Sequence, residues 1–296
     1  MDQAEKLRNI IKLQNQEAVN QARVIAVTSG KGGVGKSSVA VNLAVKFREQ
    51  GKRVIIFDAD FGLANVEVMF GAIPKFNLAD MIFRGKELKD IIVNGPMDIG
   101  FISGGSGING LSNMTRDQVA YLVYKIRELE TLADIIIIDT GAGISDSVLE
   151  FVSSSNEVLL VATSEPTSIT DAYALLKALN SRAGFDREST VIKVVANRIM
   201  DEEEGKNLFN KLNVVAGKFL NIKLELLGMI PLDTNIQKAV MEQKPAVMVY
   251  PNSQGSKAFD FLAGKLLGAE NTDTQKIKRK GLSQVFVKLF NKNNAD

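Results

Sequence analysis

The chain has 296 residues, of which 45% are hydrophobic and 24% are charged, and its formal net charge is +2. These values are typical of a soluble globular protein that buries one large core or two small ones. The sequence contains no cysteine and no histidine, which excludes disulfides, iron–sulfur clusters, zinc sites with Cys or His ligands, and catalysis by imidazole or thiolate. It also lacks an apolar run of about 18 residues and a hydrophobic signal peptide, so we expect a cytoplasmic protein.

The start of the chain predicts a separate helix. Its segment DQAEKLRNIIKLQNQ places Ala4, Leu7, Ile10 and Ile11 on one face, and Asp2 is suited to cap the helix. A polar linker follows before the first apolar run. We therefore divide the chain into an N-terminal helix with its linker, a central domain, and a basic linker with a terminal helix, at residues 1–21, 22–269 and 270–296.

The central part alternates short β-rich runs with longer helical stretches. The runs are continuously apolar, which is typical of strands covered on both faces, and this predicts an α/β fold with a mostly parallel central sheet flanked by helices on both faces. Polar or glycine-containing residues follow the strands, at the edge where such sheets bind ligands. The predicted strands span residues 23–29, 53–60, 98–105, 134–141, 157–163, 190–198 and 224–231, and the clearest helices span 36–50 and 170–182.

A phosphate-binding loop follows the first predicted strand. The pattern G-x-x-x-x-G-K-[ST] is present as Gly30, Gly35, Lys36 and Ser37, between a strand and a helix as it requires. Backbone N–H groups of such a loop point at phosphate oxygens, while Lys36 reaches the β and γ phosphates and Ser37 ligates Mg²⁺. The alternative is a glycine-rich turn with incidental lysines. The predicted phosphate loop consists of Gly30, Lys31, Gly32, Gly33, Val34, Gly35, Lys36, Ser37 and Ser38.

Aspartates end two other predicted strands. Asp139 follows a fully apolar run, where a carboxylate is suited to hold Mg²⁺ through water, although it is alternatively a helix cap. Asp58 and Asp60 end a second strand, and their alternative role is that of solvated turn residues. Because there is no histidine, Asp60 is the first candidate to position an attacking water, and Asp58 is a further candidate ligand of Mg²⁺.

Six motifs in order resemble those of the MinD/ParA family of P-loop ATPases, from about residue 23 to 267: KGGVGKSS, DADFGLAN, IIIIDTGAG, SEPTSITDAY, VANR and IPLDTNI. The resemblance implies ATP or ADP with Mg²⁺, and it implies that Lys31 reaches across an ATP-sandwiched homodimer to the partner's phosphates. A cation supplied in trans makes hydrolysis conditional on dimerisation. The family's water-activating, Walker B and interface aspartates correspond to Asp60, Asp139 and Asp171. Its adenine-reading positions correspond to Asn197, Arg198, Pro231, Leu232 and Asp233. Each of these residues, like Asp171, is alternatively a loop or helix-cap residue.

The tail combines a basic cluster with an apolar stripe. From Lys276 onward there are six Lys or Arg and one acid, so this part carries +5 and the rest of the chain −3. Apolar side chains recur at helical spacing, which predicts an amphipathic helix on an anionic membrane surface. Two tails bind more tightly than one, so we expect ATP-bound dimers on the membrane and ADP-bound monomers off it. The alternative is a helix packed on its own domain. The predicted membrane face consists of Leu282, Val285, Phe286, Leu289 and Phe290.

The start of the chain resembles the D-Q-A-x-x-L-R segment of FlhG proteins, also called YlxH or FleN, a group within this family that regulates flagellar number and placement. The resemblance implies stimulation of FlhF, a GTPase of the signal-recognition-particle type, and a contact with flagellar C-ring proteins. A glutamine is suited to orient water in a partner's site. The alternative is a helix docked on its own domain. The matching residues are Asp2, Gln3, Ala4, Leu7 and Arg8.

Other functions within the same family remain as alternatives. A division-site ATPase of the MinD type would share the ATP-controlled membrane switch. A ParA-type partition ATPase would bind DNA through basic patches on the folded body, but this body carries −3 and its basic cluster adjoins an apolar face, so no nucleic acid is expected. An iron–sulfur scaffold ATPase would need cysteines, which the chain lacks.

Overall fold

A computed structural model describes residues 22–60, 65–105, 115–182, 185–268, 281–284 and 286. Within these residues one eight-stranded sheet has the order β3-β4-β2-β5-β1-β6-β7-β8. Neighbouring strands are parallel except β3 and β4, which are antiparallel. The predicted mostly parallel sheet is therefore confirmed, although the two-residue strand β3 was not predicted. The strands are β1 (Arg23–Ser29), β2 (Val54–Ala59), β3 (Val93–Asn94), β4 (Gly100–Ser103), β5 (Ile135–Ala142), β6 (Glu157–Ala162), β7 (Val191–Ile199) and β8 (Leu224–Pro231).

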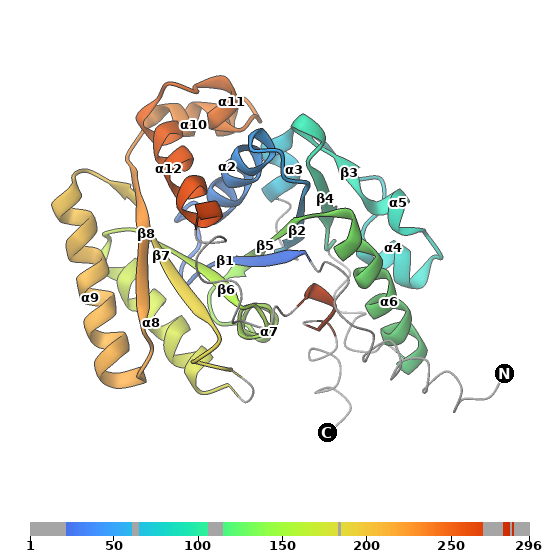
Figure 1. The fold of residues 1–296 in the computed structure, drawn as a ribbon, viewed down its shortest axis with the longest axis horizontal. Helices are drawn as coiled ribbons and strands as arrows, with labels where there is room; N and C mark the ends of the chain where they lie inside the picture. Colours follow the sequence, from blue (N-terminus) through green and yellow to red (C-terminus); the bar gives the residue numbers. More distant parts are fainter. Residues whose placement is uncertain are drawn as a thin grey trace.

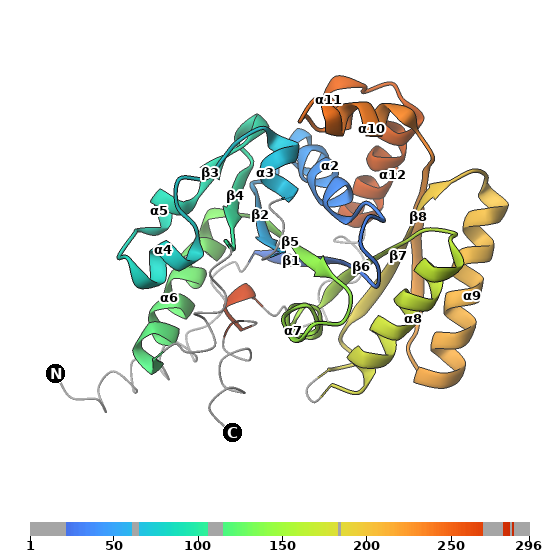
Figure 2. The ribbon, with the colours of Figure 1, turned by 180° about the vertical axis from the view of Figure 1, so that it is seen from behind.

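Helices cover both faces of the sheet. Helices α2, α10, α11 and α12 lie on one side, and α6, α7, α8 and α9 lie on the other (Figures 1 and 2). Helix α8 begins at Pro166, four residues before the predicted start, because proline is favoured in the first turn of a helix. The helices are α2 (Lys36–Glu49), α3 (Asn65–Phe70), α4 (Leu78–Phe83), α5 (Leu88–Ile91), α6 (Arg116–Leu132), α7 (Asp146–Ser154), α8 (Pro166–Asn180), α9 (Glu202–Leu220), α10 (Thr234–Met241), α11 (Ala246–Val249) and α12 (Gln254–Gly268), with a short 3₁₀ turn at Pro96–Asp98.

The central strands are buried on both faces. In β1, Ile25 and Val27 pack in the cluster that contains α2 and α12, while Val24 and Ala26 pack in the cluster that contains α6. Successive side chains of a strand point to opposite faces. The strands are therefore continuously apolar because their side chains pack into two cores, one on each side of the sheet.

The C-terminal segment contributes to one of these cores. Leu282 is 0% exposed and Phe286 is 1% exposed. The ring of Phe286 lies 5.7 Å from those of Phe57 on β2 and Phe151 on α7. This differs from the prediction, which placed both residues on a membrane-facing surface outside the central domain. An apolar stripe indicates that a helix face is buried, but it does not distinguish protein from lipid. Val285, Leu289 and Phe290 lie outside the residues whose side chains are described.

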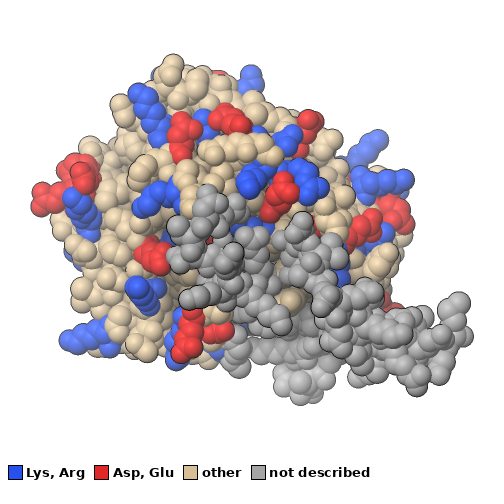
Figure 3. Space-filling view, viewed as in Figure 1, with Lys and Arg blue, Asp and Glu red and all other residues tan. Residues whose placement is uncertain are grey.

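The described surface carries charges of both signs. Lys and Arg side chains alternate with Asp and Glu over the described part of the face in Figure 3, and no broad region of one sign is seen there. No helix of the described ranges is long and apolar enough to span a bilayer.

Candidate functional site

The loop between β1 and α2 has the geometry of an anion site. Gly35 precedes the first residue of α2, and its φ of 96° is left-handed. This conformation favours glycine, and a Cβ at Gly35 would lie 2.4 Å from the Nδ2 atom of Asn197, so a larger residue would also displace that side chain. No side chain caps the start of α2. The first backbone N–H groups of a helix lack partners within the helix, and here they are available to phosphate oxygens.

A cavity of about 630 Å³ lies beside this loop at the carboxyl-terminal edge of the sheet. Its size suits a small organic ligand. The structure brings most of the predicted site together around it: Gly32, Gly33, Gly35, Lys36, Ser37, Ser38, Asp60, Asn197, Arg198, Pro231, Leu232 and Asp233 all line it. Sequence reasoning did not assign to the site the part of the wall that α10 supplies, namely Ile236, Gln237, Val240 and Met241. The one signal for them was the IPLDTNI motif, which ends at Ile236 and which the other three residues follow.

The two lysines of the loop point to different places. Lys36 is 6% exposed and lines the cavity. The ammonium group of Lys31 instead donates to the Glu165 carboxylate at 2.7 Å and to the Thr167 hydroxyl at 2.9 Å, and Lys31 does not line the cavity. The Lys31 ammonium holds the pKa of Glu165 below its usual value. Lys31 therefore does not face the cavity of its own chain in this conformation.

Asp139 is a buried carboxylate without a hydrogen-bond partner among the described residues. It is 0% exposed, and neither of its oxygens accepts a hydrogen bond from the described part of the chain. Burial raises its pKa to about 6, although the nearby Ser37 hydroxyl and Lys36 ammonium act in the opposite direction. An unpaired buried carboxylate is costly, and a bound cation is one way to compensate for it.

The oxygen ligands around Ser37, which lines the cavity, and Asp139, which lies close to Ser37, fit Mg²⁺. The ion is usually held by one or two carboxylates together with phosphate oxygens and water, and it needs no cage of three acidic side chains. Asp139 and the Ser37 hydroxyl are the residues that would hold it, next to Lys36. Since Asp139 has no other described partner, its two oxygens remain available for this role.

Asp58 lies beside Asp139 on the neighbouring strand and, unlike Asp139, accepts hydrogen bonds from described backbone groups. Its Oδ1 accepts from the backbone N–H of Asp60 at 3.0 Å, and its Oδ2 accepts from that of Val66 at 3.3 Å. Burial and the charge of Asp139 raise the pKa of Asp58 to about 8. Asp58 therefore holds the backbone of Asp60 and of Val66 close to the end of β2. Its direct role as a metal ligand stays a prediction.

Asp60 is the acidic side chain that reaches the cavity from β2. One of its oxygens accepts from the Asn65 amide at 3.2 Å, which orients the carboxylate. The other oxygen lies toward Gly141 at the end of β5. Asp60 therefore lies on the cavity wall between the ends of β2 and β5, and its role in positioning water stays a prediction.

Asn197 and Asp233 hold the opposite wall in place. The Nδ2 of Asn197 donates to the carbonyl of Val34 in the loop at 2.7 Å, and its Oδ1 accepts from Arg198, whose φ of 57° is left-handed. Asp233 accepts from the N–H groups of Asn235 and Gly255 at 2.8 and 2.9 Å, so it caps the starts of both α10 and α12. Recognition of adenine by these two residues stays a prediction.

Asp171 lies next to the loop rather than on the cavity wall. It is half-buried in α8, and a Cβ at Gly30 would lie 2.1 Å from its carbonyl carbon. The backbone of α8 thus packs directly on the first glycine of the loop. The role of Asp171 at a dimer interface stays a prediction. The predicted partner-activating residues Asp2, Gln3, Leu7 and Arg8 lie outside the described part of the chain.

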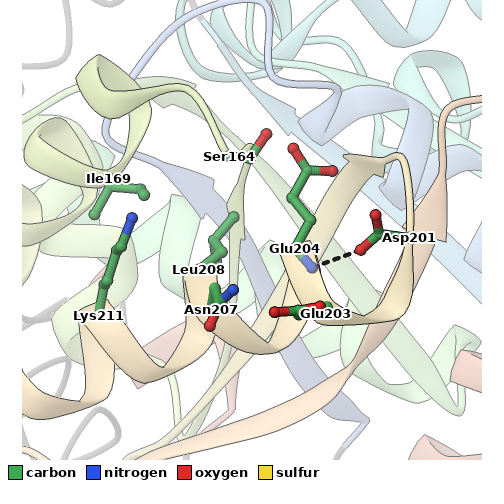
Figure 4. Close-up of a pocket in the computed structure, with 8 residues that line it drawn as sticks. All are labelled: Ser164, Ile169, Asp201, Glu203, Glu204, Asn207, Leu208 and Lys211. Carbon is green, nitrogen blue, oxygen red and sulfur yellow. Dashed lines mark hydrogen bonds between the residues drawn. The ribbon is translucent and has the colours of Figure 1, made fainter.

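A second hollow of about 380 Å³ lies between α8 and α9 (Figure 4). Two of its three acidic residues form hydrogen bonds at the start of α9: Asp201 accepts from the backbone N–H of Glu204 at 2.8 Å, and Glu204 accepts from that of Met200 at 2.6 Å. Its lining contains neither a glycine loop nor a lysine at a helix start, and its single lysine is Lys211. These features do not fit a phosphate, so the cavity at the loop is the candidate site.

Comparisons with known proteins agree with this geometry. The profile of the ParA family, described as "NUBPL iron-transfer P-loop NTPase", matches residues 20–267. The chain is 43% identical over 249 residues to the antiactivator FleN of Pseudomonas aeruginosa, covering 84% of this chain and 88% of FleN. It is 31% identical to the flagellum site-determining protein YlxH of Helicobacter pylori, covering 98% of both. The structure of MinD with Mg-ADP from Pyrococcus horikoshii matches with a TM-score of 0.64 and 25% identity, over 88% of this chain and 99% of MinD.

Proposed function

The chain belongs to the ParA family of P-loop NTPases, and on that premise we propose that it is an ATP-hydrolysing switch that regulates the number and placement of flagella. Its similarity to FleN and YlxH over most of their length supports the flagellar role. The observation that carries the switch is the different placement of the two loop lysines. Lys36 lines the cavity, whereas Lys31 points outward to Glu165 and is therefore available to a second subunit.

The cavity would hold the nucleotide by its phosphates. The N–H groups of the loop and the start of α2 bind the phosphate oxygens, and the Lys36 ammonium neutralises part of their charge. Ser37 and Asp139 would hold Mg²⁺, which when bound offsets the charge of the phosphate oxygens. No cysteine is present, so the iron-transfer function in the family description does not extend to this chain.

Hydrolysis would depend on Asp60 and on a second subunit. Asp60, oriented by Asn65, positions the attacking water and takes up its proton. In the ATP-bound homodimer Lys31 leaves Glu165 and stabilises the negative charge on the transferring phosphoryl group of the partner. A single chain would then hydrolyse ATP slowly, because it lacks that cation.

Membrane association would require release of the C-terminal segment. Leu282 and Phe286 are buried in the core in this conformation, so neither side chain can face lipid until the segment leaves it. We expect ATP-driven dimerisation to favour that release and to present two tails, while the basic residues 276–280 add attraction to anionic lipid.

Co-sedimentation with vesicles tests this switch. Binding to vesicles that contain anionic phospholipid should be strong with ATP and weak with ADP, and neutral vesicles should bind little in either state. A variant that ends at residue 280 should bind neither kind of vesicle. Equal binding with ATP and ADP would contradict the switch.

A second experiment tests the flagellar assignment. GTP hydrolysis by a purified FlhF-type GTPase should rise when the full chain is added. The rise should disappear with a variant that lacks residues 1–20 and with Gln3→Ala, while both variants keep their ATPase activity. If the full chain gives no stimulation, the ATP switch can still hold, but the division-site alternative returns.

A further inference from the structure

We propose that Asn42 is a positioning residue for the nucleotide, because its side chain joins the phosphate-binding helix α2 to the wall of the cavity formed by α10 and α11. Asn42 is 0% exposed in the middle of α2. The inference rests on the proposed binding of ATP in this cavity.

The amide of Asn42 is bonded on both sides. Its Nδ2 donates to the carbonyl of Ser38 at 2.7 Å and lies 3.4 Å from the Ser38 hydroxyl. Its Oδ1 accepts from the backbone N–H of Val247 at 3.0 Å, across 205 positions of the chain. A buried amide is tolerated only when it is hydrogen-bonded in this way.

Asn42 acts as the cap of α11 from another helix. Helix α11 begins at Ala246 after Pro245, whose side chain cannot accept a hydrogen bond. The first N–H groups of a helix need an acceptor from outside it, and a side-chain oxygen normally provides one from the preceding residue. Here the oxygen comes from α2, so the position of α11 is set by the phosphate-binding helix.

The position of α10 depends on that of α11. The connection between them is bonded back to α10: the N–H groups of Glu242, Gln243 and Lys244 donate to the carbonyls of Lys238, Val240 and Ala239 at 2.9, 3.1 and 3.0 Å. Val240 and Met241, at the end of α10, line the cavity. Ser38, on the other side of Asn42, lines the same cavity. One buried side chain therefore sets the distance between the phosphate end and the opposite wall.

A comparison of ATP with inorganic tripolyphosphate, which has neither base nor ribose, separates this role from general stability. In Asn42→Ala the affinity for ATP should fall about tenfold, because the wall that faces the base and ribose is no longer fixed. The affinity for inorganic tripolyphosphate, which can contact only the phosphate loop, should change less than about twofold. Asn42→Asp keeps an oxygen for Val247 but has no N–H for Ser38, so its affinity for ATP should lie between those of the wild type and Asn42→Ala.

Asn156 provides a matched control. It precedes β6 at the opposite edge of the sheet, is 9% exposed, and donates to the carbonyl of Ser189 at 3.4 Å. Asn156→Ala also removes a buried amide, so its melting temperature should fall, while its affinities for ATP and tripolyphosphate should equal those of the wild type. The affinities are measured by displacement of a fluorescent ATP analogue from full-length chains.

Two results would overturn the inference alone, given that the wild type binds ATP. One is an unchanged ATP affinity in Asn42→Ala, or in Asn42→Asp if the alanine variant does not fold. The other is an equal loss of affinity for ATP and tripolyphosphate, which would indicate a damaged phosphate loop. A wild-type chain that does not bind ATP would overturn the proposed function and this inference together.

Discussion

The Lys31 ammonium lies 2.7 Å from the Glu165 carboxylate and outside the cavity that Lys36 lines. The two lysines are five residues apart in one loop, and we expect their substitution by alanine to have different effects. Lys36→Ala should lose ATP binding. Lys31→Ala should bind ATP within about twofold of the wild type but lose roughly a hundredfold or more of its turnover, because a cation supplied in trans acts mainly on the transition state.

The concentration dependence of turnover provides the measurement. Turnover per chain should rise with protein concentration in the wild type and stay low and constant in Lys31→Ala. Rapid hydrolysis by Lys31→Ala would contradict the role in trans, and loss of ATP binding by this variant would place Lys31 in its own cavity.

Asp60→Asn should separate binding from hydrolysis. The amide keeps the shape of the side chain and its contact with Asn65 but cannot accept a proton from water, so the rate of the chemical step should fall by about 10²- to 10⁴-fold. Affinity for ATP should change little. Single-turnover assays measure the step, and Asp117→Asn, an exposed carboxylate in the first turn of α6, is the control. Normal hydrolysis by Asp60→Asn would assign the water to another residue.

Phe286→Ala should destabilise the chain in the absence of lipid. The ring is 1% exposed and packs on Phe57 and Phe151, and removal of a buried Phe side chain typically lowers the free energy of unfolding by about 3–5 kcal/mol. The matched control is Phe261→Ala on α12, whose ring is 58% exposed and should matter much less. Urea unfolding measures both. Equal, small effects would mean that the segment is not docked in solution.

Glu130 should make docking of the same segment depend on pH. Its carboxylate accepts from the backbone N–H of Ser283 at 2.6 Å, and a Cβ at Gly281 would lie 2.5 Å from its Oε1. Burial raises the pKa of Glu130, although the bonds from Ser283 and the charge of Arg127 act against this. For an acid whose folded pKa is raised, the stabilising contribution is full below the unfolded pKa and is lost as pH rises through the folded value.

Glu130→Gln keeps an acceptor for Ser283 without a buried charge. Relative to the wild type, its free energy of unfolding should therefore rise as pH increases from about 4 to 8, whereas the other acids contribute equally to both chains and cancel. Glu130→Ala removes the acceptor and should release the segment at every pH, which limited proteolysis would detect. A constant difference between wild type and Glu130→Gln across this range would show that Glu130 does not control docking.

Much of the fold followed from local patterns. Three elements have their predicted positions: the strand at 23–29, the strand at 224–231 and the helix that starts at Lys36. Each of them could be predicted because its pattern lies in consecutive residues of the chain. The phosphate loop was equally local, since its backbone geometry depends on glycines and a helix start that follow one another in the chain. Asp139 and Asp60 were found because parallel strands end at the same edge of the sheet.

Residues that are neighbours in the chain were enough to predict the sheet, the glycine loop and the positions of the acids at the edge of the sheet, because these features are local. What each polar or apolar group contacts depends on residues that are far apart in the chain and that only folding brings together. In the folded chain Asp58 accepts a bond from the backbone of Asp60, Asp233 caps two helices, and Asn42 bonds to Val247. Folding also placed Leu282 and Phe286 against protein, since periodicity predicts that a face is buried while only the folded chain provides the surface that buries it.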